Sequence, residues 1–253
     1  MEEKENKAMG ESKTVVDIQQ LKKSFGQNHV LKDVTLQLKK GENLVVLGKS
    51  GTGKSVLIKC LVGLIIPDEG RLQVFDKNVM ELERKALNEL RTKIGFLFQS
   101  GALYDSMTVR ENLEFPLRRQ TGAKSQEELD ALVLEALENV GLAEAVDKMP
   151  SELSGGMRKR ISLARTLILK PEIMLYDEPT TGLDTITSKE ISTLILAIQK
   201  KYSTSSIIIT HDMDCARIVS DRVLVLNEGK VIGVGTFDEL KNSSAPEIKG
   251  FFE

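Results

Sequence analysis

Cysteine is scarce in this sequence, which disfavours a disulfide framework. Its 253 residues contain two cysteines, Cys60 and Cys215, which lie far apart and form no CxxC pair. Both stand in apolar or helical surroundings, where a free cysteine behaves as a small core residue. We therefore expect two buried thiols and a reducing compartment.

Long apolar segments are also missing. No run of the sequence reaches the roughly 18 consecutive apolar residues that a membrane-spanning helix requires. The first residues, MEEKENKAMGESK, have no apolar stretch of the kind that a secretory signal contains. We expect residues 1–13 to form a flexible, solvated tail and the protein to be cytoplasmic.

A strong net charge is the third absence. The chain has 35 basic and 37 acidic residues, and its formal charge is -2. Proteins that bind nucleic acids usually carry a basic excess, so we expect no nucleic acid partner. The 41% hydrophobic and 28% charged residues are ordinary for a soluble globular protein. The length suits one large α/β domain, or a core with a small subdomain.

Four short apolar runs predict buried parallel strands, because they are continuous and do not alternate with polar residues. Each run ends in a glycine or a polar residue, and the four span residues 43–48, 94–99, 173–178 and 206–211. In open α/β sheets, ligands bind beyond the C-terminal ends of the strands, so these polar residues are expected at one functional edge. A later strand and hairpin are predicted over 222–235, with the turn at Glu228 and Gly229.

The middle of the chain has a helical pattern. Residues 125–142 open with a capping box, Ser125 and Glu128, and continue with apolar residues at helical spacing until Gly141. The strand pattern is absent from about residue 100 to 165. We therefore expect a helical subdomain inserted between core strands.

The segment GKSGTGKS, residues 48–55, matches the phosphate-binding pattern G-x-x-x-x-G-K-S/T. It follows a predicted strand and precedes an apolar helix, which is the context that this motif requires. Glycines let the backbone approach the phosphates, and the helix N-terminus adds a positive dipole end. Lys54 would reach the β- and γ-phosphates, and Ser55 would hold Mg²⁺. We expect the nucleotide to be bound by Gly48, Lys49, Ser50, Gly51, Thr52, Gly53, Lys54, Ser55 and Val56.

Polar residues at three other strand ends complete the predicted catalytic edge. We expect Asp177 to bind Mg²⁺ directly or through water, and Glu178 to orient or deprotonate the attacking water. Gln99 would reach Mg²⁺ or water, and His211 would hydrogen-bond the γ-phosphate or Glu178. The predicted catalytic residues are thus Glu178, His211, Gln99 and Lys54, and the predicted metal ligands are Ser55, Gln99 and Asp177.

A second anion site is indicated by SELSGGMRKRISLAR, residues 151–165. Ser154, Gly155 and Gly156 open a helix whose basic residues are Arg158, Lys159, Arg160 and Arg165. A Ser-Gly-Gly turn that opens a basic helix is suited to hold an anion. The phosphate loop already supplies one such site, so the second needs a different explanation.

Taken together, these motifs make the chain resemble the nucleotide-binding subunit of an ABC transporter, from about residue 15 to 240. The family's motifs occur in order: Walker A at 48–55, the Q-loop glutamine Gln99, the LSGG signature at 153–156, Walker B at 173–178, a D-loop at 181–184 and the switch histidine His211. The resemblance also implies that Phe25 stacks on adenine, although a lone phenylalanine is more often a core residue.

This resemblance implies a fold, a reaction and a dimer. The implied fold is α/β: a P-loop NTPase core with a mostly parallel sheet, an N-terminal antiparallel β region and the helical subdomain. The ATPase domain would span 14–241, and 242–253 would be a short C-terminal tail. Two subunits of this family pack head to tail, so the signature of one closes over the γ-phosphate held by the other. The chain would form a homodimer with two composite sites that bind ATP and Mg²⁺ and hydrolyse ATP.

Sequence similarities outside the shared motifs indicate one branch of the family. The signature has Met157 where glutamine is common, and this LSGGM, the segment 96–118 and the ending 245–252 resemble Mla-type phospholipid-transport ATPases. This implies a permease dimer, an MCE-domain substrate-binding protein, phospholipid as cargo, and a peripheral position on the cytoplasmic face of the inner membrane. The alternatives are an ABC transporter for another cargo and a soluble ABC ATPase of the iron–sulfur assembly type.

The residues after Gln99 allow two interpretations. In such ATPases this segment receives a helix of the permease, in a groove that would be lined here by Ala102, Leu103, Tyr104, Met107 and Val109. Equally, these residues would form the core of the helical subdomain, with Thr108 only capping a helix.

Overall fold

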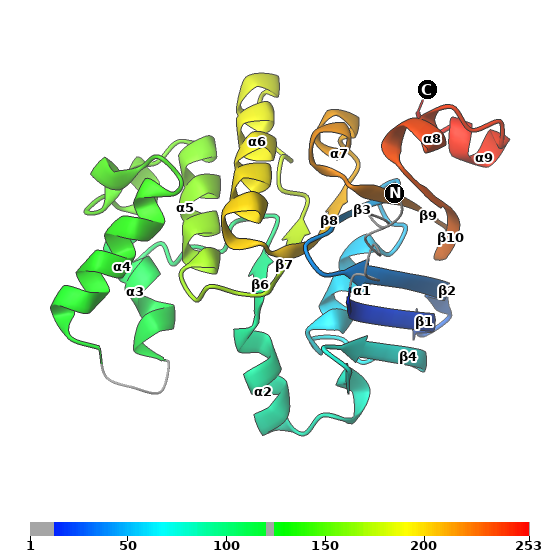
Figure 1. The fold of residues 1–253 in the computed structure, drawn as a ribbon, viewed down its shortest axis with the longest axis horizontal. Coiled ribbons are helices and arrows are strands. Elements are labelled where there is room, and N and C mark those ends of the chain that lie inside the picture. The colour runs from blue at the N-terminus through cyan, green and yellow to red at the C-terminus, as the bar shows by residue number, and fades with distance from the viewer. Residues whose placement is uncertain (1–12, 120–123, 253) are drawn as a thin grey trace, which may run out of the picture.

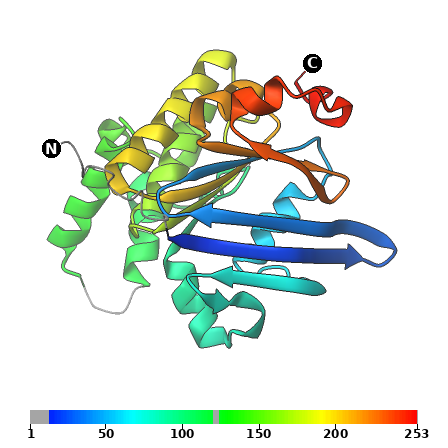
Figure 2. The same ribbon diagram turned by 45° about the vertical axis from the view of Figure 1, so that its right-hand side comes forward.

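One ten-stranded sheet organises the computed structural model, which describes residues 13–119 and 124–252. The strand order is β5-β4-β1-β2-β10-β9-β3-β8-β7-β6. Helices lie on both faces of the sheet, and three further helices stand beyond the β6 edge (Figures 1 and 2).

The parallel part of the sheet confirms the four predicted strands. They are β3 (Asn43–Leu47), β6 (Ile94–Leu97), β7 (Ile173–Asp177) and β8 (Ser205–Thr210). They pair in parallel in the order β3-β8-β7-β6, and β9 (Arg222–Asn227) joins the other side of β3. Every residue of β3, β7 and β8 is buried, which explains their continuous apolar sequences. The C-terminal ends of these strands therefore meet at one edge.

The antiparallel part contains the first two strands of the described chain. It is built from β1 (Thr14–Phe25), β2 (Asn28–Lys39), β4 (Glu69–Val74) and β5 (Lys77–Asn78). The predicted hairpin is also confirmed, because β9 pairs antiparallel with β10 (Lys230–Gly235). Glu228 and Gly229 both have positive φ in its turn, as a two-residue hairpin turn requires. Strand β10 links the two parts through a parallel bridge between Lys230 and Asp33.

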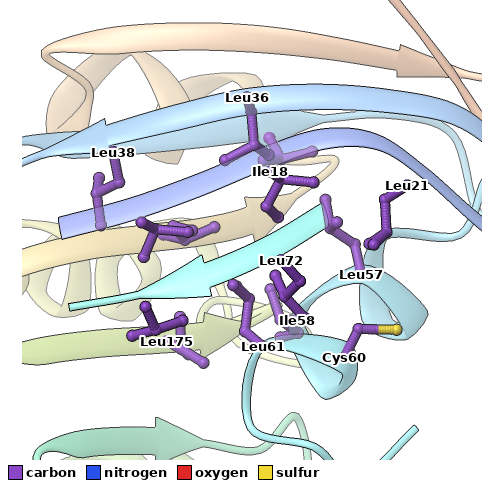
Figure 3. Packing of buried hydrophobic residues seen from close by; sticks show 14 of the residues in the cluster. Ile18, Leu21, Leu36, Leu38, Leu57, Ile58, Cys60, Leu61, Leu72 and Leu175 are labelled. Atoms are coloured by element: carbon purple, nitrogen blue, oxygen red, sulfur yellow. The ribbon is translucent and has the colours of Figure 1, made fainter. Parts of the chain in front are cut away.

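Two hydrophobic clusters fill the space between the sheet and its helices. On one face, α1 (Lys54–Leu61) packs Leu57, Ile58 and Cys60 against the strands (Figure 3). The same cluster includes Leu90 of α2 (Arg84–Thr92). On the other face lie α6 (Thr185–Tyr202) and α7 (Met213–Val219), which buries Cys215. Both cysteines are free and buried, as predicted. Each fully buried leucine or isoleucine contributes about 1.5–3 kcal/mol to folding, so these clusters hold α1 firmly beneath β3.

A third cluster lies among three helices between β6 and β7. These helices are α3 (Val109–Arg118), α4 (Gln126–Glu138) and α5 (Gly155–Leu167). Capping boxes open α3 at Thr108 and α4 at Ser125. Helix α4 ends at Glu138 and not at residue 142, and Gly141 has a left-handed φ of 68° in the turn that follows. Between β6 and β7, the described regular structure is helical, as the sequence pattern indicates.

The C-terminal segment packs against the second cluster. It contains α8 (Phe237–Lys241) and α9 (Pro246–Lys249). Ile248 is buried, and the ring of Phe252 meets that of Phe237 edge-on at 5.4 Å. The described part of residues 242–253 is therefore built onto the domain.

Candidate functional site

The phosphate loop connects β3 to α1, and two of its three glycines, Gly48 and Gly53, are closely packed. Gly53 has a φ of 100°, which L side chains rarely adopt. A Cβ atom there would lie 2.8 Å from Cδ2 of Leu31 and 3.0 Å from the carbonyl oxygen of Val30. At Gly48 it would lie 2.7 Å from the carbonyl oxygen of Leu226. Strands β2 and β9 thus leave no room for a side chain at either position.

Lys54 lies inside this loop and is only 6% exposed. Its ammonium donates hydrogen bonds to the carbonyl oxygens of Gly48 and Lys49, at 2.6 and 3.1 Å. It also lies 3.4 Å from Oε1 of Glu178. The lysine therefore connects the phosphate loop to the acidic end of β7.

Ser55 and Asp177 form the predicted metal-binding pair. The Ser55 hydroxyl donates a hydrogen bond of 3.0 Å to Oδ1 of Asp177. The pKa of the Asp177 carboxyl is raised above its usual value, because the effect of burial exceeds the opposing effect of this hydrogen bond. A hydroxyl and a carboxylate at this separation fit Mg²⁺, which binds hard oxygen atoms and often uses few carboxylates together with substrate phosphates. No cluster of three or more His, Cys, Asp or Glu suited to a metal occurs among the described residues.

Glu178 is held in an unusual backbone conformation. Its φ is 49°, in the left-handed region that a glutamate seldom enters. Its Oε2 atom lies 2.9 Å from Nδ1 of His211 and also accepts a hydrogen bond of 3.3 Å from the His211 amide. The side chain is 10% exposed. This geometry places a carboxylate where it can accept a proton from a water molecule in the cleft.

Most of the predicted site residues line one cleft of about 620 Å³, whereas Gly48, Thr52 and Asp177 are not among its lining residues. The predicted residues that line it are Lys49, Ser50, Gly51, Gly53, Lys54, Ser55, Val56, Gln99, Glu178 and His211. Phe25 is not among its lining residues. That ring lies at the end of β1, is 49% exposed, and has the Lys23 ammonium 5.3 Å from its centroid. Val30 of β2 lines the cleft on that side, so adenine stacking by Phe25 stays a prediction.

The Ser-Gly-Gly turn lies in a different hollow. Ser154 caps α5 by accepting a hydrogen bond of 3.2 Å from the Met157 amide. With Gly155 and Gly156 it lines a depression of about 430 Å³ that also includes Asp184. This depression and the phosphate-loop cleft have no lining residue in common. One chain therefore does not bring its signature onto its own phosphate loop.

Three of the four basic side chains on α5 are engaged within the chain, and of the four only Arg160 lines the depression at the Ser-Gly-Gly turn. Arg160 donates to the Val140 carbonyl and pairs with Glu190. Arg165 donates to the Ala102 carbonyl, and its guanidinium lies 4.7 Å from the Tyr104 ring centroid. The third, Lys159, is buried. At the start of α5, the groups available to an anion are therefore the backbone of the turn, the helix dipole and the Arg160 guanidinium, which also pairs with Glu190.

Sequence reasoning missed the role of Lys159 at the catalytic edge. Its ammonium donates a hydrogen bond of 2.6 Å to the Gln99 carbonyl and lies 3.5 Å from that of Glu178. Lys159 stands three and four residues before Ser162 and Leu163, which are both buried. That helical spacing was the available signal that this lysine points inward.

The family follows from comparison with known proteins. Residues 31–181 match the model of the ABC transporter family. The chain belongs to this family. It is an ABC ATPase, with the fold of the solved ATP-binding cassettes. A dimeric cassette in a post-hydrolysis state, bound to ADP and Pi, superimposes with a TM-score of 0.80 at 32% identity, covering 88% of this chain and 98% of that one.

Curated relatives of this ABC ATPase carry names for different cargoes. It is 41% identical, over 93% of its length, to a probable ribonucleotide transport ATP-binding protein of Mycobacterium leprae, and spans 68% of that protein. It is 37% identical, over 98% of its length, to the chloroplastic protein TRIGALACTOSYLDIACYLGLYCEROL 3 of Arabidopsis thaliana, and spans 76% of it. The methionine import ATP-binding protein MetN of Campylobacter jejuni is 39% identical over 94% of the chain, which spans 75% of it. No described helix of this ABC ATPase is both long and apolar enough to cross a membrane.

Proposed function

We propose that this ABC ATPase powers phospholipid transport, at the cytoplasmic face of the inner membrane, together with a permease dimer and an MCE-domain substrate-binding protein. The lipid assignment rests on the LSGGM signature and the two segments that resemble Mla-type ATPases. One relative, the TRIGALACTOSYLDIACYLGLYCEROL 3 protein, bears the name of a glycolipid and aligns with 98% of the chain.

The separation of the two hollows carries the mechanistic part of the proposal. The phosphate loop and the signature line different depressions of one chain. A second copy, packed head to tail, supplies the missing signature to each phosphate loop. The dimeric cassette among the similar structures supports this arrangement. ATP then holds two half-sites together, and its hydrolysis releases them.

The proposed chemistry assigns one task to each residue of the cleft. Lys54 exchanges its backbone acceptors for phosphate oxygens, and its charge stabilises the transferred phosphoryl group. Ser55, Asp177 and Gln99 would hold Mg²⁺, which neutralises phosphate charge when bound. Glu178 accepts a proton from the attacking water, and His211 fixes the carboxylate in position.

The surface after Gln99 is the proposed permease contact. The structure divides the residues of this segment between core and surface. Val109 is buried and Leu103 packs against the third cluster, whereas Tyr104 is 41% exposed. The Tyr104 ring packs against Phe115, with ring centroids 4.9 Å apart, and against the Arg165 guanidinium, 4.7 Å from its centroid. A rigid exposed tyrosine suits contact with a helix of a partner protein.

Gentle detergent purification of the tagged protein from its own cells tests the proposed function. Copurifying proteins and lipids are identified by mass spectrometry. We expect a multi-span permease, an MCE-domain protein and bound phospholipid. Tyr104→Asp is expected to lose the permease while keeping its ATP affinity, and Tyr202→Phe, on the distant end of α6, is the matched control.

The same experiment distinguishes a second cargo. MetN of C. jejuni is 39% identical, so an amino-acid importer is the competing assignment. A permease with a soluble amino-acid-binding protein, and without phospholipid, would favour that importer. Soluble partners alone would contradict both transporter assignments and favour the iron–sulfur assembly type.

A further inference from the structure

Lys159 is a buried cation in the second turn of α5. It is 7% exposed. No ion pair found among residues 13–119 and 124–252 includes it. The pKa of this lysine is lowered, because the effect of burial exceeds the opposing effect of the nearby charges of Asp177 and Glu178. Lysine is rarely buried without a pairing carboxylate, because removing the charge from water is costly. Such a departure from the usual pattern occurs most often at functional sites.

Both contacts of the Lys159 ammonium are backbone oxygens of proposed active-site residues. The Gln99 carbonyl, 2.6 Å away, belongs to the turn that follows β6. The Glu178 carbonyl, 3.5 Å away, belongs to the residue after β7. The two side chains differ in role, but one ammonium holds both peptide units.

The Glu178 peptide has particular need of such support. Its φ of 49° is unfavourable for a glutamate, so surrounding contacts must maintain it. The Glu178 amide donates to the Ile209 carbonyl at 2.9 Å, and its own carbonyl accepts from the Thr181 amide at 3.3 Å. Lys159 adds a positive charge on the carbonyl side of this peptide. Because this conformation aims the Glu178 side chain at His211 and Lys54, a shift of the peptide moves the carboxylate.

Helix α5 joins this contact to the signature. Ser154 is the N-cap of α5, and Lys159 lies five residues further along the same helix, about 7.5 Å along its axis. We propose that Lys159 is a positioning residue, whose ammonium sets the backbones of Gln99 and Glu178 and thereby ties the signature helix to the catalytic groups of its own chain. This inference rests on the proposed function, in which Gln99 and Glu178 act on ATP.

The test compares steady-state hydrolysis with nucleotide binding in Lys159→Met, which keeps the length of the side chain and removes the charge. We expect kcat to fall about 10- to 100-fold, the range that the loss of a charged hydrogen bond produces. The affinity of the monomer for a fluorescent ATP analogue stays within about twofold of the wild type, because Lys159 does not line the cleft. The Mg²⁺ concentration for half-maximal activity rises, since Gln99 is a proposed ligand. Lys159→Arg restores most of kcat.

A stability control separates positioning from folding. Leu167→Ala removes a buried side chain two turns further along α5, in a different set of contacts. It is expected to lower Tm at least as much as Lys159→Met while keeping kcat and the Mg²⁺ requirement. If Lys159→Met does not fold, Lys159→Gln is measured in its place and interpreted in the same way.

Two results would overturn the inference: wild-type kcat in the Lys159 variant, or equal losses of kcat in both variants at equal loss of Tm. Glu178→Gln is measured in parallel. If Glu178→Gln hydrolyses ATP normally, the part of the proposed function that makes Glu178 the base fails. If the Lys159 variant hydrolyses ATP normally and Glu178→Gln does not, the assignment of Glu178 stands and the role proposed for Lys159 is wrong.

Discussion

The Glu178 carboxylate lies 2.9 Å from Nδ1 of His211, although the two residues are separated by more than thirty positions in the sequence. Adjacent parallel strands β7 and β8 bring them together, because each residue directly follows its strand. The same Oε2 atom accepts from the His211 amide, so both the ring and the backbone of the histidine orient the carboxylate. The carboxylate is thus held in the position of a general base.

Glu178→Gln is expected to bind MgATP and to form a stable dimer without turnover. The amide keeps the size of the side chain but cannot accept the proton of the attacking water, so kcat should fall by at least about 100-fold. Size-exclusion chromatography with ATP reports the dimer, and phosphate release reports turnover. Normal hydrolysis by this variant would show that another group is the base.

Gly53→Ala is expected to weaken ATP binding by more than about tenfold. The added Cβ would lie 2.8 Å from Leu31 Cδ2, in a backbone conformation with φ of 100°, so the phosphate loop must shift. Gly26→Ala is the control, because Gly26 also has positive φ but a Cβ there meets nothing within 4 Å. Calorimetric ATP titration of both variants checks the prediction. Equal, wild-type affinities would mean that the loop shape does not determine binding.

The two cysteines are expected to resist alkylation in the native protein. Burial raises the pKa of Cys60 to about 12 and that of Cys215 to about 11, so almost no thiolate forms at pH 8. Iodoacetamide labelling followed by mass spectrometry should modify both residues in denaturant and neither in the folded state. Rapid labelling of either cysteine in the native protein would contradict the packing described here.

Phe25→Ala is expected to reduce ATP affinity about 5- to 100-fold if the ring stacks on adenine, and Phe25→Tyr should keep the affinity. The ring is half exposed and outside the lining of the cleft, so nucleotide binding must bring the two together. Equilibrium titration with ATP and with triphosphate alone separates the adenine contribution. An unchanged ATP affinity in Phe25→Ala would leave Val30 as the contact on that side.

The sequence was sufficient to predict the parallel strands and their polar ends. Continuous apolar residues identify β3, β7 and β8 because these strands are buried on both faces. The ends of helices were less predictable: α4 stops at Glu138, although apolar spacing continues to Val140. The helix is closed by a local turn, in which the amides of Val140 and Leu142 donate to the Leu137 carbonyl and Gly141 adopts a left-handed φ.

The contacts of individual side chains were the second feature that the sequence could not predict. The helical spacing from Lys159 to Ser162 and Leu163 indicates that this lysine faces inward, but only the folded chain shows that its ammonium reaches the carbonyls of Gln99 and Glu178. Likewise, the sequence places Phe25 before the phosphate loop, but the length and course of the β1–β2 hairpin decide where its ring lies. Both outcomes depend on tertiary contacts that no local pattern encodes.

Complementation between two inactive variants tests whether the signature of one chain completes the phosphate site of another. Ser154→Arg blocks the signature and leaves ATP binding by the monomer intact, whereas Lys54→Ala disables the phosphate loop. Each variant alone should be inactive.

An equal mixture of the two variants should recover about a quarter of the wild-type rate, because half of the dimers are mixed and each mixed dimer has one intact composite site. The double variant mixed with wild type provides the matched control, since its mixed dimers contain no composite site with both parts intact. A mixture as inactive as its components, although mixed dimers form, would contradict the account and place the signature's action within its own chain.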